Sequence, residues 1–330
     1  MRAQSPRLIR TLVTLAFATA AAPGLSHGQA PEKTLRIAIL SSGTQEVRSP
    51  FDQALVQGLR EQGWVEGRNL FIDRRYGSSR IVENAKELGA KDLDAILTTC
   101  TPSTRLMMDA TSKTPIIMAA VSDPIRQHII ASYAKPGGNV TGTSSQAEDL
   151  LIKRLEHVTA LLPGVTTVAV LANPRNPAHA LAWQRLEREA PAMRLRVVRF
   201  EFNGSSEAAG AIEGAARAAA GALLVLPDDP LMLNARPQIV AAAAKHRIPD
   251  FYWERSFVES GGLMSYGEDL RATYRNAAVY FDKIKKGARP AVMPVEQPTR
   301  FELVINAKTA RALNVTVPAA MLVSADEVLN

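Results

Sequence analysis

Short apolar runs alternate with longer amphipathic stretches along most of the chain. A run of about four to eight mostly apolar residues, closed by turn-forming residues, is typical of a strand buried on both faces of a sheet. Residues 35–40 (LRIAIL) are the first such run, and residues from about 50 to 62 have the pattern of a helix. Repeated alternation of these two patterns predicts an α/β protein with a largely parallel sheet.

The same order of elements occurs twice, at an offset of about 130 residues. Four strand–helix units in each half predict two similar, doubly wound lobes. The expected strands are 35–40, 69–76, 93–98 and 115–121 in the first half, and 166–171, 195–202, 222–226 and 249–253 in the second. The expected helices are 50–62, 81–91 and one after Pro102, and then 178–189, 206–219 and 231–245.

Extended segments lie at the seams between the halves. Residues 135–142 (KPGGNVTG) form a turn followed by a short strand, and residues 261–267 (GGLMSYG) close the second half. Because the chain passes between the lobes more than once, we expect a hinge of several strands, which bends about one axis. The rest of the chain is expected as a helix at 268–286, a proline-rich segment at 290–298, a strand at 301–306 and a short helix at 307–313.

The first 28 residues have the features of an export signal. Three arginines precede the uncharged run 12–22 (LVTLAFATAAA), which is too short to span a bilayer of roughly 30 Å. Cleavage after Gly28 and cleavage after Ala30 both stay open, because Pro31 adjoins the second bond. No cysteine lies nearby, so no lipid anchor is indicated. We expect a cleaved Sec-type leader over 1–28, with a disordered tail as the alternative.

The composition adds no new function to this picture, but it argues against several classes of protein. With 330 residues, 46% hydrophobic and 22% charged, the chain fits a soluble protein of two ordinary domains. No later run reaches the length of a membrane span. The net charge of +7 includes the three leader arginines, and the other basic residues are interspersed with acids, so nucleic-acid binding is not indicated. Cys100 is the only cysteine and cannot form an internal disulfide.

Polar loops follow the expected strands of both halves. In open parallel sheets ligands bind beyond the carboxyl ends of the strands, so facing lobes would direct these loops toward one cleft. The same residue types are ordinary helix caps and turns, so one loop alone indicates little. One helix end contributes about 0.3–1 kcal/mol, whereas micromolar binding requires about 8 kcal/mol, so several loops must act together. The loops are 41–44, 99–103, 122–124, 173–177, 228–230 and 252–254.

The last of these loops contains two aromatic residues. Tyr252 and Trp253 alternate along a strand, so one is expected to face the cleft and the other to pack inside the lobe.

Signatures of catalysis and metal binding are missing from the sequence. The histidines are isolated, and the loop at 41–47 (SSGTQEV) lacks the glycines of a dinucleotide site. Ser132 and Lys135 match the short pattern Ser-x-x-Lys, but they lie at a turn. We therefore expect no cofactor, no metal and no catalytic residue. An exported α/β enzyme, such as a hydrolase or racemase, stays as the alternative.

Six segments carry a family resemblance: RIAILSSG at 36–43, GLREQGWVEGRNL at 58–70, KPGGNVTG at 135–142, VLANPRNP at 170–177, GGLMSYG at 261–267 and PTRFELVINAKTARALNVTVP at 298–318. Together they resemble the periplasmic substrate-binding proteins of bacterial ABC importers, more narrowly the TrpX-like family. The resemblance implies a type I two-lobed fold in the periplasm. It also implies capture of a small molecule, such as an amino acid or another carboxylate-bearing or aromatic solute, and its delivery to an inner-membrane permease. We expect a monomer with no nucleic-acid partner.

Carried over by position, the resemblance implies particular residues. By the same analogy, 35–142 plus 267–293 form the first lobe, and 143–266 plus 294–330 form the second. The chain departs from the family pattern at Cys100, where glycine is expected, and at 254–256, where Arg-Glu is expected. These departures affect which solute is bound. The implied ligand-binding residues are Ser42, Gly43, Thr101, Ser103, Asp123, Asn173, Asn176, Asp228 and Tyr252, with the hinge at Gly142 and Tyr266.

Overall fold

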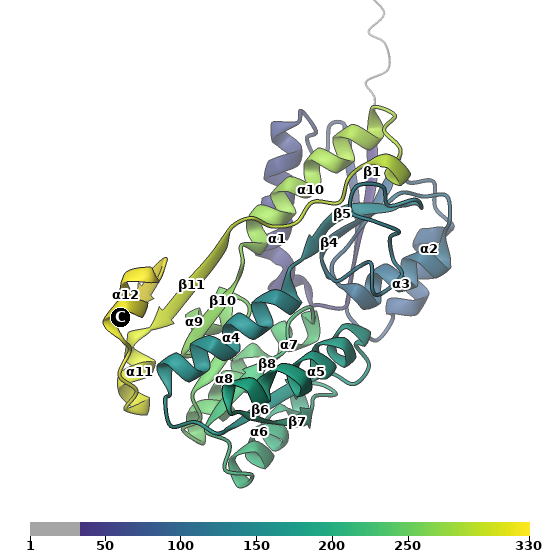
Figure 1. Cartoon of the computed structure of the whole chain (residues 1–330). Helices are drawn as coiled ribbons and strands as arrows, with labels where there is room; N and C mark the ends of the chain where they lie inside the picture. Colours follow the sequence, from purple (N-terminus) through teal and green to yellow (C-terminus); the bar gives the residue numbers. More distant parts are fainter. Residues whose placement is uncertain (1–33) are drawn as a thin grey trace, which may run out of the picture. The chain divides into compact units, whose positions relative to one another are not determined.

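The computed structural model describes residues 34–330, which form one compact unit (Figure 1). The leader expected over 1–28 lies outside the described residues. Among residues 34–330, no helix combines the length and the apolar character that a membrane span requires.

The first half of the described chain builds a five-stranded parallel sheet in the order β2-β1-β3-β4-β5. Strands β1, β3, β4 and β5 are almost wholly buried, as their apolar runs predict, whereas the edge strand β2 is only partly buried. The strands are β1 (Leu35–Ser41), β2 (Leu70–Tyr76), β3 (Ala95–Thr98), β4 (Ile116–Ser122) and β5 (Val140–Ser145). The helices between them are α1 (Gln45–Glu61), α2 (Ile81–Gly89) and α3 (Thr101–Ala110).

The second half builds a seven-stranded sheet in the order β12-β11-β10-β9-β8-β6-β7, parallel except between β10 and β11. Its part β7-β6-β8-β9-β10 repeats the order of the first sheet. The expectation of two similar α/β lobes is therefore confirmed. The strands are β6 (Thr167–Ala172), β7 (Arg196–Glu201), β8 (Ala222–Val225), β9 (Asp250–Tyr252), β10 (Met264–Glu268), β11 (Phe301–Asn306) and β12 (Glu327–Leu329).

The helices of the second half differ in places from the pattern-based expectation. The helix expected over 231–245 is two helices, because Pro237 lacks the N–H that would continue the first. Helix α4 was not predicted at all. The helices are α4 (Ala147–Leu161), α5 (Pro177–Glu189), α6 (Ala208–Arg217), α7 (Pro230–Asn234), α8 (Arg236–Lys245), α9 (Arg255–Glu259), α10 (Leu270–Lys285), α11 (Ala307–Leu313) and α12 (Ala319–Ser324), with short 3₁₀ turns η1 (Ala190–Met193), η2 (Ser205–Glu207) and η3 (Pro290–Val292).

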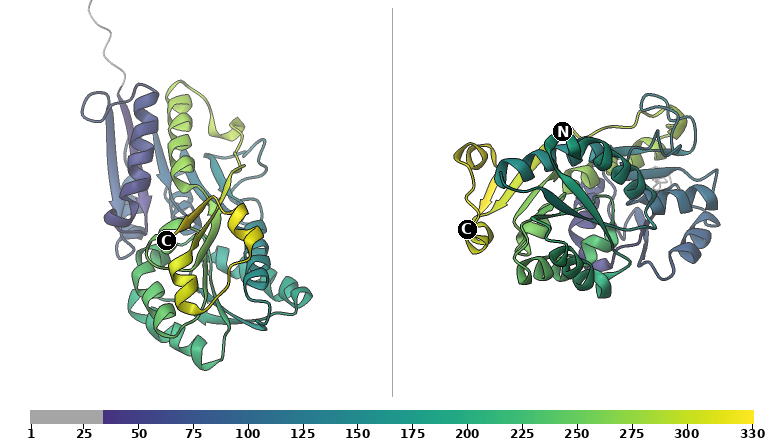
Figure 2. Two further views of the ribbon diagram at one scale, coloured as in Figure 1. Left: turned by 90° about the vertical axis from the view of Figure 1, so that its left-hand side faces the viewer. Right: turned by 60° about the horizontal axis from the view of Figure 1, so that its bottom comes forward.

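Helix α10 follows a strand of the second sheet but packs alongside α1 of the first (Figure 2). The two helices approach closely at Gly58, where a Cβ atom would lie 2.4 Å from the carbonyl oxygen of Arg275. The indole of Trp64 also donates to Asp282 of α10 at 3.1 Å. Strands β11 and β12, in contrast, extend the second sheet. The lobe boundaries given above stay a prediction.

Three segments of the chain cross between the two sheets, at 145–147, 268–270 and 292–301. Two of them run side by side, since Glu296 accepts from the Ser144 N–H at 2.9 Å and donates to the Gly142 carbonyl at 3.0 Å. Gly142 has φ 123°, and a Cβ atom there would lie 2.2 Å from the Met118 carbonyl oxygen, so only glycine fits. The hinge role of Gly142, and of Tyr266 in the middle of β10, stays a prediction.

Candidate functional site

The loops at the carboxyl ends of the two sheets meet directly. The Thr101 hydroxyl at the start of α3 donates to Asp228, which follows β8, at 2.7 Å. The Thr44 N–H before α1 donates to Asn234 of α7 at 3.1 Å. Both bonds join residues of the first half to residues of the second. The two lobes are therefore closed on one another at this edge.

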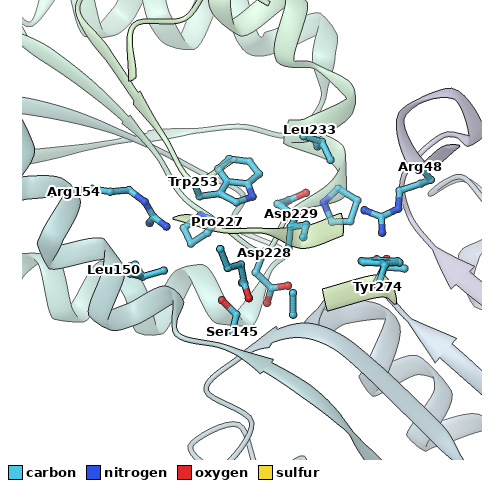
Figure 3. A pocket seen from close by; sticks show the side chains of 15 residues that line it. Arg48, Ser145, Leu150, Arg154, Pro227, Asp228, Asp229, Leu233, Trp253 and Tyr274 are labelled. Atoms are coloured by element: carbon cyan, nitrogen blue, oxygen red, sulfur yellow. The ribbon is translucent and has the colours of Figure 1, made fainter. Parts of the chain in front are cut away.

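Behind these contacts lies a small space, which we call the inner cavity (Figure 3). Its volume is about 30 Å³, enough for about two water molecules. A ligand of amino-acid size therefore requires the lobes to lie further apart than they do here. The cavity is lined by Arg48, Thr99, Ala120, Ser145, Leu150, Arg154, Pro227, Asp228, Asp229, Pro230, Leu233, Trp253, Glu268, Leu270 and Tyr274.

A second space, the outer cavity, lies between the same loops and has a volume of about 160 Å³. Several of its polar side chains bond within the protein: the Asn173 amide donates to Asp229, and the Asn176 amide donates to the Asp228 carbonyl, each at 2.7 Å. It is lined by Ser42, Ser78, Ile81, Cys100, Pro102, Leu106, Asn173, Arg175, Asn176, Asp228, Asp229, Pro230 and Leu231.

The inner cavity differs from the outer cavity because four of its lining side chains have buried polar atoms without a hydrogen-bond partner. These atoms are Nε and Nη2 of Arg48, Nη1 of Arg154, Oε2 of Glu268 and the hydroxyl of Tyr274. Buried polar groups are normally hydrogen-bonded, and leaving one unpaired costs about 1–3 kcal/mol, more when it is charged. Four such groups around one cavity make it the candidate site for a polar ligand.

Arg154 and Glu268 form a complementary pair of such groups. Arg154, on α4, donates through Nε to the Tyr266 carbonyl at 2.7 Å, and burial lowers its pKa to about 9. Glu268 ends β10, and burial raises its pKa to about 7. Within the described residues neither has an ion-pair partner, so a donor and an acceptor both remain available to a ligand.

Asp228 separates the two cavities and lines both. Its carboxylate accepts from the N–H and the hydroxyl of Thr101 and from the Ser122 N–H. Burial raises its pKa to about 7, against these hydrogen bonds, and the neighbouring Asp229 adds to the rise. Asp228 therefore joins the lobes and titrates near neutral pH.

His179, on α5, holds the two second-lobe loops that reach the cavities. Its Nδ1 accepts from the Asn173 N–H at 2.8 Å, and its Nε2 lies 2.7 Å from the Pro227 carbonyl oxygen. Since a backbone N–H can only donate, Nδ1 is the acceptor and Nε2 carries the proton. The imidazole is therefore neutral, and burial lowers its pKa accordingly.

Some of the expected ligand-binding residues line a cavity, and others only contact residues that do. Ser42, Asn173, Asn176 and Asp228 line the outer cavity, and Thr101 bonds Asp228. Gly43 lies against Arg48, where a Cβ atom would be 2.9 Å from Cδ of that arginine.

Ser103 and Asp123 are engaged in local structure. The Ser103 hydroxyl accepts from the N–H groups of Thr99 and Cys100 at the start of α3. Asp123 accepts from the Arg126 N–H in a turn and has φ 33°. Their expected contact with a ligand stays a prediction.

The position of Tyr252 corrects the expectation that it faces the cleft. Its side chain is fully buried, donates to Asp250 at 2.6 Å and stacks on Phe257 with ring centroids 4.3 Å apart. Trp253 follows the end of β9, packs on the same Phe257 with ring centroids 4.8 Å apart, and lines the inner cavity. Of these two aromatic residues, the one at the cavity is therefore Trp253.

The residues with unpartnered groups were all missed in the sequence, because the search followed loops after strands. Arg48 and Tyr274 lie near the N-terminal ends of α1 and α10, and Arg154 lies on the unpredicted α4. One signal was available: Arg154 shares a helical face with Leu151, Leu155 and Val158, which are buried. A lone cation on an apolar face of a helix is a candidate ligand contact.

Two lobes of repeated topology, joined by three crossings and enclosing a polar cavity, define an α/β ligand-binding protein of the type I periplasmic class. Comparison with known proteins supports this assignment. The family model for ABC transporter substrate-binding proteins matches residues 37–329, and the chain belongs to this family. Proteins of this family are extracytoplasmic and deliver a solute to an ABC importer. The enzyme alternative is therefore set aside.

The chain is similar to several characterised proteins. It is 28% identical over 265 residues to a tyrosine-binding protein of Clostridioides difficile, covering 79% of this chain and 76% of that protein. A Streptococcus pneumonia ABC domain crystallised with L-Trp is 27% identical, with a TM-score of 0.83 over 90% of this chain and all of that one. A conserved domain protein of Vibrio cholerae has the same identity, TM-score and coverage.

Proposed function

We propose that the inner cavity binds an α-amino acid with an aromatic or large apolar side chain. The observation that carries this proposal is the pair formed by Arg154 and Glu268, two buried groups of opposite charge at one cavity, each with one polar atom that has no hydrogen-bond partner. An α-amino acid presents a carboxylate and an ammonium on one carbon, so it would satisfy both. A sugar has no charge to offer either group.

The remaining lining supports the same class of ligand. Trp253, Leu150 and Leu270 offer apolar surface beside the charged pair, and Figure 3 shows Trp253 and Leu150 on the side of the cavity where Arg154 lies. Apolar lining with a few placed polar groups is usual for small-molecule sites. The relatives described as tyrosine-binding and as complexed with L-Trp are consistent with this choice.

In this proposal the loops found from the sequence close the site. Thr101 and Asp228 bond across the mouth, and Asn173 and Asn176 fix the loop around Asp228. We further propose that a leader over 1–28 is cleaved, that the mature protein is periplasmic and serves an inner-membrane permease, and that it is monomeric, since one chain lines the whole cavity.

The test is a thermal-shift panel of L-amino acids, sugars and organic acids on the mature protein. A ligand at 100 times its Kd stabilises the native state by about 2.7 kcal/mol, which raises the melting temperature by several degrees. We expect shifts from aromatic L-amino acids, and their loss in Arg154→Met and Glu268→Gln. A response confined to sugars would refute the proposal, as would undiminished shifts in both variants.

A further inference from the structure

Arg48 is a second buried cation at the inner cavity, apart from the amino-acid site proposed above. It lies in α1 and is 2% exposed, and its Nε and Nη2 atoms have no partner. Its guanidinium carbon lies 4.6 Å from the ring centroid of Phe51 and 4.7 Å from that of Tyr274. These rings orient the guanidinium but accept no strong hydrogen bond from it.

Two acids influence Arg48 electrostatically without forming an ion pair with it. Asp52 raises the pKa of Arg48; one of its carboxylate oxygens accepts from the hydroxyl of Tyr76, and the other, Oδ1, is buried without a hydrogen-bond partner. Glu254 caps α9 by accepting from the Ser256 N–H at 2.8 Å. Desolvation is the largest influence, and it lowers the pKa of Arg48. Within the described residues, Arg48 therefore has no ion-pair partner.

A buried cation without an ion-pair partner is unfavourable, because it loses its hydration and gains only indirect stabilisation from acids that do not contact it. Arg48 lines the cavity, so an anion that enters the cavity can reach the guanidinium beside the two rings. The Tyr274 hydroxyl, also unpartnered, lines the same cavity and could donate to the same group.

Arg48 and Arg154 lie at different ends of the cavity. Figure 3 shows Arg154 with Leu150 on one side of Trp253, and Arg48 with Tyr274 on the other. The two cations come from different lobes, one on α1 and one on α4. The proposed α-carboxylate pairs with Arg154, so it leaves Arg48 without an anion.

We propose that the ligand carries a second carboxylate, at the far end of its side chain, which pairs with Arg48 and the Tyr274 hydroxyl. This inference rests on the amino-acid site formed by Arg154 and Glu268. Arg48 is then the residue that selects anionic over neutral side chains. A guanidinium binds a carboxylate through two parallel N–H bonds, and its free Nε and Nη2 are the adjacent pair that this geometry uses.

The test compares two probes that differ by one carboxylate, 4-carboxy-L-phenylalanine and L-phenylalanine, by calorimetric titration of the mature protein. L-tyrosine tests a neutral acceptor at the same position. We expect the carboxylated probe to bind at least about tenfold more tightly than the other two. Arg48→Met should abolish this preference, and Arg48→Lys should keep part of it. Melting temperatures of both variants show whether they fold.

Asp52→Asn is the matched control, because it alters the electrostatic neighbour of Arg48 without touching the cavity lining. It should keep the preference. Equal affinity for the three probes, tighter binding of tyrosine, or a preference that survives Arg48→Met would overturn the inference and leave the amino-acid site intact. Binding of 3-(4-carboxyphenyl)propanoate with no binding of any amino acid would instead refute the Arg154–Glu268 head-group site.

Discussion

Replacing His179 by alanine tests how the second lobe positions its binding loops. The imidazole is 1% exposed and joins the loop after β6 to the loop after β8 through two short hydrogen bonds. The variant leaves the Asn173 N–H and the Pro227 carbonyl buried and unpaired. Each unpaired backbone group lowers the stability by about 1–3 kcal/mol, and the cavity left by the missing ring lowers it further. We expect a loss of about 3–5 kcal/mol in the free energy of unfolding.

The pH dependence of this loss gives a second readout. The folded-state pKa of His179 lies below its ordinary value because of burial, so its contribution is fully present above the unfolded pKa of about 6.5. As the pH falls, the unfolded chain takes up a proton that the folded ring resists, and the contribution is lost. The stability difference between wild type and His179→Ala should therefore shrink from about pH 8 to about pH 5.

Urea unfolding followed by circular dichroism measures both effects. His246→Ala is the control, since His246 is only partly buried, follows α8 and should change stability by no more than about 0.5 kcal/mol. A cost for His179→Ala as small as that of the control would refute the bridging role. A difference that grows on acidification would contradict the assigned proton position.

Two further changes test the hinge and the charge at the mouth. Gly142→Ala should destabilise the protein by about 2 kcal/mol or more in urea unfolding, because the new Cβ meets the Met118 carbonyl at 2.2 Å; Gly138→Ala, with open space around it, should be near neutral, and equal costs would contradict the reasoning. Asp228→Asn should remove a pH dependence of the free energy of unfolding. Because the folded-state pKa of Asp228 is raised to about 7, its contribution to stability is fully present below the unfolded pKa of about 3.8 and is lost as the pH rises through 7. Wild type should therefore lose up to about 4 kcal/mol relative to the variant between those limits, and parallel stability curves would show that Asp228 is ionised in both states.

The fold followed from the sequence because buried strands of parallel sheets read as continuous apolar runs. The runs at 35–40 and 166–171 lie at equivalent positions in the two sheets, in β1 and β6. The start of α1 was misplaced because Pro50 is typical of a first turn, whereas the helix begins at Gln45 and contains that proline.

The site could be predicted only in part. Loops at strand ends are visible in a sequence, and they led to Asp228 and Asn173. Arg48, Arg154 and Glu268 come from two helices and a strand that crosses the hinge, and only tertiary packing brings them together. The choice between Tyr252 and Trp253 depended on where the three-residue strand β9 ends, which a sequence pattern does not fix.

The central claim is that the lobes enclose an amino acid and close on it. The distance between spin labels on Ser79→Cys and Ser205→Cys tests this directly, since both residues are exposed, one in the first half of the described chain and one in the second. Cys100 need not be replaced, because it is fully buried and burial raises its thiol pKa to about 12. The inner cavity of about 30 Å³ must widen to admit an amino acid, so the account predicts that the amino acid giving the largest thermal shift changes the mean distance and narrows the distribution to one population. An unchanged distribution at saturating ligand would contradict it.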